Sequence, residues 1–262
     1  MSVTMIWRRL RVVRVIILIA MLTAGVMPAQ ADLAGESLAS LQMDAWRARM
    51  GFHLLSIRGN NPDDQAALDQ LLSRGEQRIK ALQASASTDA ETRLVAQLQT
   101  GWQALSERAR DNPLATLGYA DYGAMSEMNT TTLTLDRLLK NTDLGTAGPY
   151  LDIYRLAVDM QKLASEYLAL AAFPSAGLPT GTSLAPMDFA VAASDIDKRL
   201  AKLQLHYQEN AGGRETLAFI QQRWAFIRGS VPKMNDQSAA RIPYLFYRYS
   251  TQVADRVEAL GA

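Results

Sequence analysis

A short segment near the C-terminal end of the chain concentrates side chains that can hold a ligand. Residues 241–249 read RIPYLFYRY and contain three tyrosines, one phenylalanine and two arginines. Arginine beside aromatic rings can bind an anionic or flat molecule through paired hydrogen bonds and stacking. The segment could equally form a protein contact, or pack its rings into a core beneath the arginine side chains. We take four of its residues as candidate ligand-binding residues: Arg241, Tyr244, Tyr247 and Arg248.

Three more arginines are candidates because each is adjacent to an aromatic residue in the sequence. They are Arg47 after Trp46, Arg155 after Tyr154 and Arg223 before Trp224. The first two also follow an aspartate by three residues, a spacing that permits an ordinary ion pair within one helix. We expect these arginines to bind a ligand where they face a space between helices.

The residue types that usually carry catalysis or hold a metal ion are scarce. The chain has no cysteine, which excludes disulfides, zinc–thiolate sites and covalently attached haem. Its two histidines, His53 and His206, stand in neither a His-Glu-x-x-His nor a Glu-x-x-His pattern. We therefore expect no enzymatic activity, no metal site and no cofactor. A haem held by histidine and methionine is the alternative.

The composition is that of a packed protein. Hydrophobic residues make up 48% of the 262 residues, an ordinary share for a folded chain. The formal net charge is only +1, so there is no basic excess to attract a phosphate backbone. We expect no nucleic-acid partner.

The N-terminal 31 residues have the three parts of a secretory signal peptide. Four arginines lead into a 13-residue uncharged run, residues 15–27, and a small-x-small cleavage site ends at Ala31. As a helix, this run rises about 20 Å, which is shorter than the roughly 30 Å hydrocarbon core that a membrane anchor must cross. The flanks of Arg8-Arg9 fit the twin-arginine export motif poorly, which favours general secretion. We expect cleavage after Ala31, a periplasmic or secreted protein, and no membrane span after cleavage.

After residue 31 the apolar residues recur at spacings of three and four, which predicts helices throughout. The first expected helix, 33–57, is apolar on more than one side, so we expect it to be buried on more than one side. Seven more are expected, the last over about 238–260. Pro243 lies inside the last helix, which must therefore begin or bend there. One long loop, 173–187, is rich in proline and glycine.

The eight expected helices form two series of four that resemble each other. The third and seventh align with tryptophan on tryptophan, as Val95, Leu98, Trp102 and Leu105 fall on Leu217, Ile220, Trp224 and Ile227. The first and second align with the fifth and sixth in the same order, whereas the fourth and eighth align ambiguously. Apolar spacing alone would align one pair of helices, but it explains a fixed order less well. We therefore predict an all-α protein of two tandem four-helix up-and-down units, 32–143 and 144–262, from an internal duplication.

We therefore expect an exported, non-enzymatic helical protein that binds a small ligand or a partner protein of the cell envelope. In architecture alone, two stacked four-helix units resemble the extracytoplasmic sensor modules of some bacterial chemoreceptors, although those modules are held by two membrane helices and we expect no second one here. Two other functions are compatible with the sequence. One is a haem- or metal-binding bundle in electron transfer or storage, and the other is a structural or assembly subunit of the envelope.

Overall fold

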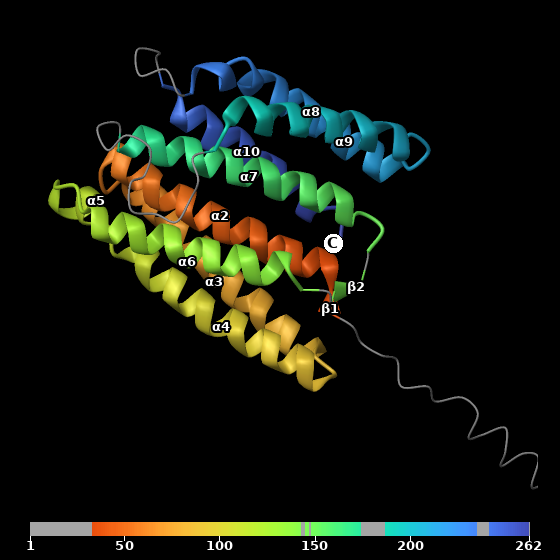
Figure 1. Cartoon of the computed structure of the whole chain (residues 1–262), viewed down its shortest axis with the longest axis horizontal. Coiled ribbons are helices and arrows are strands. Elements are labelled where there is room, and N and C mark those ends of the chain that lie inside the picture. The colour runs from red at the N-terminus through yellow and green to blue at the C-terminus, as the bar shows by residue number, and fades with distance from the viewer. Residues whose placement is uncertain (1–32, 143–144, 147, 174–186, 235–240, 262) are drawn as a thin grey trace, which may run out of the picture.

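The computed structural model describes residues 33–142, 145–146, 148–173, 187–234 and 241–261 (Figure 1). The expected signal peptide, 1–31, and most of the 173–187 loop lie outside the described residues. Long helices dominate the described part, which confirms the all-α prediction. Two strands of two residues each, β1 (Leu33–Ala34) and β2 (Gly145–Thr146), pair in parallel. They fix the start of the first helix beside the connection between the two halves of the chain.

The first half of the chain forms four long helices and one short one. Their bounds are α2 (Gly35–Arg58), α3 (Pro62–Ser85), α4 (Asp89–Arg110), α5 (Pro113–Leu117) and α6 (Tyr122–Lys140). Thr88 forms a capping box with Glu91 at the start of α4, which satisfies backbone N–H groups that a helix leaves unpaired. The sequence does not predict α5, because this helix buries none of its residues and so has no apolar periodicity.

In the second half of the chain, the described residues form four long helices. Their bounds are α7 (Leu151–Ala172), α8 (Phe189–His206), α9 (Ala211–Arg228) and α10 (Pro243–Glu258), with a 3-10 turn at Val231–Lys233. Pro243 stands in the first turn of α10, where its missing N–H costs no intrahelical hydrogen bond. The last helix therefore begins at Pro243 and does not bend there.

Helices α2 and α7 lie side by side at the centre of the molecule. Figure 1 shows α8 and α9 on one side of this pair and α3 and α4 on the other. Of the 24 residues of α2, 18 are buried, so the helix has no continuous solvent-facing side. The expectation that the first helix is buried on more than one side is thus confirmed.

Each face of α2 contributes to a different hydrophobic core. Leu41, Ala45 and Phe52 pack with α3, α4 and α6. Met43, Trp46, Met50 and other residues of the opposite face pack with α7, α8, α9 and α10. The two cores are therefore joined through one helix, and the connection holds the halves in a fixed arrangement. Among the described residues, no helix combines the length and the apolarity needed to cross a membrane.

Candidate functional site

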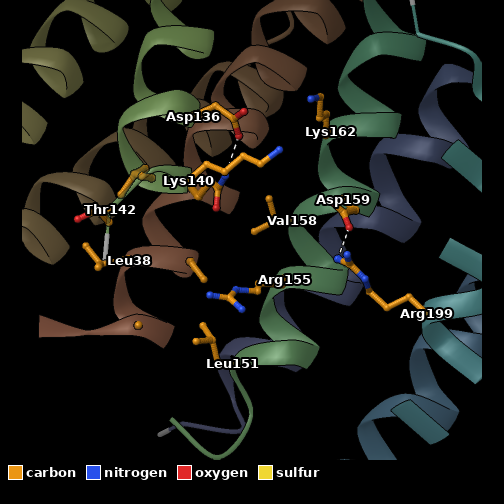
Figure 2. Close-up of a pocket in the computed structure, with 14 residues that line it drawn as sticks. Leu38, Asp136, Lys140, Thr142, Leu151, Arg155, Val158, Asp159, Lys162 and Arg199 are labelled. Atoms are coloured by element: carbon orange, nitrogen blue, oxygen red, sulfur yellow. Dashed lines mark hydrogen bonds and ion pairs between the residues drawn. The ribbon is translucent and has the colours of Figure 1, made fainter. Parts of the chain in front are cut away.

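A pocket of about 360 Å³ opens between α2, α6 and α7, with one residue from α8 at its edge (Figure 2). We call it the junction pocket, because α2 and α6 belong to the first half of the chain and α7 and α8 to the second. Its apolar surface includes Leu38, Leu151 and Val158. Its charged lining residues are Asp136, Lys140, Arg155, Asp159, Lys162 and Arg199.

The charged residues reach the junction pocket because of where they stand on their helices. Arg155, Asp159 and Lys162 are spaced by four and three, so they share one face of α7. Lys140 is the last residue of α6, and Arg199 comes from the middle of α8. Figure 2 shows the guanidinium of Arg155 reaching from α7 into the space beside α2.

Both carboxylates of the junction pocket are already engaged by the protein. Asp136 Oδ1 accepts from Trp46 Nε1 at 2.8 Å and from Gln42 Nε2 at 2.7 Å. Asp159 forms an ion pair with Arg199. Burial raises the pKa of Asp159, and the nearby cations Arg199, Lys162 and Lys140 counteract part of that rise. Asp159 is therefore paired with a cation of the lining, whereas the donors to Asp136 are neutral groups that do not cancel its charge.

Among the described residues, three cations of the junction pocket have no carboxylate oxygen closer than 3.9 Å: Lys140, Arg155 and Lys162. The guanidinium of Arg155 lies 3.9 Å from Asp152, and both side chains are exposed, so this pair is weak. The Lys162 ammonium lies over the ring of Trp46, 5.5 Å from its centroid. Lys140 ends α6, where a positive charge is favoured by the helix dipole. The lining carries four cations against two anions, and this excess suits a negatively charged ligand.

Arg47 and Tyr247 come together at a second pocket, also about 360 Å³, between α2, α3 and α10. We call it the network pocket, lined by Arg47, Gly51, Ala67, Leu68, Gln70, Leu71, Arg74, Tyr247, Thr251 and Asp255. Beside it, three arginines and three carboxylates form one ion-pair network: Arg47, Arg74 and Arg78 with Asp44, Asp255 and Glu258. Burial, with Asp44 close by, raises the pKa of Glu258, although the three arginines counteract it. The network connects α10 to α2 and α3.

The other candidate residues from the sequence are dispersed. Arg223 donates to Gln252 Oε1 at 2.7 Å and lies over Phe219, while Arg241 donates to the carbonyl of Leu170 at 2.6 Å. Tyr244 is exposed beneath the guanidinium of Arg58, and Arg248 lies over Tyr249. The described contacts of the segment 241–249 are therefore spread over several places. Of the seven candidates, Arg47 and Tyr247 line the network pocket together, and Arg155 lines the junction pocket.

A polar cluster that the sequence does not predict is buried between α2, α6 and α7. Arg49 is fully buried and donates to Ser165 Oγ at 2.9 Å, to Glu166 Oε2 at 3.1 Å and to Asn129. His53, one turn further along α2, is also fully buried, and neither ring nitrogen has a well-formed hydrogen bond to a described residue. Burial and the charge of Arg49 lower the pKa of His53 well below its ordinary value.

Other residues that the sequence analysis missed include Lys140, Lys162 and Arg199 of the junction pocket. The sequence offered one signal, on α7: the spacing of residues 155, 159 and 162 places their side chains on one face of this helix. The described residues contain no group of three or more histidine, aspartate or glutamate side chains placed to hold a metal ion. Comparisons with family models, with curated proteins and with solved structures found no match to the chain.

Proposed function

We propose that this chain is an exported, non-enzymatic binding protein that takes a small anionic molecule, a carboxylate or a phosphate, in the junction pocket. The observation that carries the proposal is the excess of positive charge in the pocket. Lys140, Arg155 and Lys162 surround a space large enough for a small metabolite, and the two acids beside them are held by other groups. A single exposed ion pair contributes only up to about 1 kcal/mol, so an anion needs several of these cations at once.

The proposal includes an origin by internal duplication, with four long helices in each unit. Two equivalent tryptophans support it. Trp102 on α4 donates its indole N–H to the carbonyl of Leu72 on α3 at 3.1 Å, and Trp224 on α9 donates to Asp197 on α8 at 2.6 Å. Both rings are buried, and each is held by the helix that precedes it in the chain. The pairing of the first helix of each unit, α2 with α7, then places the junction pocket between the units.

Export is proposed from the N-terminal segment, whose arginines, apolar run and Ala31 cleavage site fit a signal peptide. The full chain should be recovered from the periplasm of a bacterial host as a shortened protein. Intact mass should place its first residue at Asp32. Recovery of the uncleaved chain in the membrane fraction would contradict cleavage.

Anion binding is tested by isothermal titration calorimetry of the folded protein with succinate and with inorganic phosphate. We expect a dissociation constant below about 1 mM for at least one of them, at low salt. The variant Lys140→Gln/Lys162→Gln should weaken binding by about tenfold or more. The matched control Lys198→Gln/Lys202→Gln removes two exposed lysines of α8 outside the pocket and should retain the affinity. Equal weakening by both double variants, or no binding of either anion, would overturn the proposal.

A further inference from the structure

The network pocket has an apolar floor and a polar wall. Leu68 and Leu71 of α3 form much of the floor, beside Gly51 of α2. Gly51 lets Leu68 of α3 pack close to the backbone of α2, because a Cβ at position 51 would lie only 3.0 Å from Leu68 Cδ1. The polar wall is built from α2, α3 and α10 and includes Arg47, Arg74, Thr251 and Asp255. A ligand here would contact both halves of the chain, at a place separate from the junction pocket.

Three buried donors at the network pocket have no acceptor among the described residues. Arg47 is only 7% exposed, and its Nη2 donates to Asp255 Oδ1 at 2.9 Å. Its Nη1 is buried without a hydrogen bond, with the nearest carboxylates of Asp44 and Glu258 each at 3.7 Å. Arg74 Nε and Thr251 Oγ1 are likewise buried and unpaired. Unpaired buried donors are rare in folded proteins, and these three belong to residues that line the same pocket.

The charges around the network pocket indicate which kind of acceptor fits. The ion-pair network holds three arginines and three carboxylates, so its net charge is zero. A simple anion would be attracted by Arg47 and Arg74 but repelled by three acids. Asp255 has a side chain that is 54% exposed, so it can offer a carboxylate to a cationic group of the ligand. A molecule with both charges and no net charge matches this arrangement.

We propose that the network pocket binds a small zwitterion that carries a carboxylate and an ammonium group, such as a free amino acid with an apolar side chain. The ligand carboxylate accepts from Arg47, Arg74 and Thr251, whose unpaired donors turn toward the pocket when the ligand binds. The ligand ammonium donates to Asp255, and the apolar side chain packs on Leu68 and Leu71. The pocket volume of about 360 Å³ is within the range of small-molecule sites.

The test is calorimetry of the full folded chain with three compounds that share one apolar group: L-valine, isovalerate, which lacks the ammonium, and isobutylamine, which lacks the carboxylate. We expect L-valine to bind more tightly than either single-charge analogue by about tenfold or more. Asp255→Asn leaves a net positive network, so it should weaken L-valine and strengthen isovalerate. This reversal of preference is a result that general destabilisation would not produce.

Thr251→Val removes one unpaired donor at nearly constant volume and should weaken L-valine by several-fold. The control Thr100→Val, at an exposed position on α4, should leave the affinity unchanged. Lys140→Gln/Lys162→Gln should also leave it unchanged, which separates this site from anion binding in the junction pocket. The proposal is overturned if L-valine does not bind, if the single-charge analogues bind equally well, or if Asp255→Asn leaves the preference unaltered.

Discussion

Arg49 of α2 and Glu166 of α7 form an ion pair at 3.1 Å inside the contact between the two central helices. Neither side chain is more than a tenth exposed. Arg49 also donates to Ser165 on α7 and to Asn129 on α6, so a single guanidinium connects three helices. Buried charges of this kind are costly unless every partner stays in place.

Glu166→Ala should lower the free energy of unfolding by about 3 kcal/mol or more, because it leaves the buried guanidinium of Arg49 without its counter-charge. Urea unfolding followed by circular dichroism measures the change. Asp152→Ala is the matched control, because it removes a carboxylate from an exposed ion pair and should change stability by less than about 1 kcal/mol. A loss no greater than that of the control would show that the Arg49 pair does not stabilise the fold.

His53 should make the protein less stable as the pH falls below about 6.5, the ordinary pKa of histidine. Its pKa is lowered in the folded protein, so below this pH the unfolded state binds a proton that the folded state resists. The contribution is therefore complete above about pH 6.5 and is lost on acidification. His53 should contribute up to about 1.4 kcal/mol per pH unit to the slope of the unfolding free energy between pH 7.5 and 5.5. His53→Gln should remove this contribution, and urea unfolding at each pH measures it. His206→Gln, which removes an exposed histidine, is the matched control.

Glu91 should make the stability of the fold depend on pH in a second, more acidic range. Its Oε2 accepts the backbone N–H groups of Ser87 and Thr88, and these bonds, with those from the hydroxyls of the same residues, lower its pKa to about 2. Its Oε1 accepts the backbone N–H of Leu33. Because the folded pKa lies below the ordinary 4.5, the stabilisation is complete above about pH 4.5 and is lost as the pH falls toward 2. Glu91→Gln should lower the unfolding temperature at pH 7 and reduce its further fall between pH 4.5 and 2.5. An unchanged acid profile would contradict this role.

Gly75→Ala should destabilise the protein by about 1–3 kcal/mol, although alanine favours a helix. A Cβ at this position would lie 1.9 Å from Cζ2 of the buried Trp102 ring, which must then move. Gly229→Ala is the control, because nothing lies within 4 Å of a Cβ there and the backbone is right-handed. Thermal unfolding of the two variants should differ clearly, and near-identical midpoints would refute the packing argument.

Much of the fold could be predicted from the sequence because its helices carry strong local signals. Apolar spacing located the eight long helices, Pro243 indicated the start of the last one, and the double apolar stripe of α2 indicated its central place. The short α5 was missed because it buries none of its residues. Which helices pair across the halves depends on long-range packing, so the contact of α2 with α7 could not be inferred from spacing.

The pockets were far less predictable than the helices. Arg155 was selected for its neighbouring tyrosine. The positive charge of the junction pocket also comes from Lys140, Lys162 and Arg199, which no sequence pattern connects to Arg155. Arg47 and Tyr247 were chosen separately and lie 200 residues apart, but they line one pocket. The aromatic segment 241–249 was open to several interpretations from its composition, and a helix turns its successive side chains in different directions. Local composition thus identified single residues without their partners.

The central pair of helices also sets where the chain can tolerate change. Of 24 residues in α2, 18 are buried, and of 22 in α7, 14 are buried, whereas α3 buries only six of 24 and α8 five of 18. A substitution in α2 meets packed neighbours on nearly every side, while most positions of the outer helices face water. We expect sequences that share an ancestor with this chain to diverge fastest along α3 and α8. A related sequence should therefore be recognised by α2 and α7, whose buried residues tolerate few substitutions.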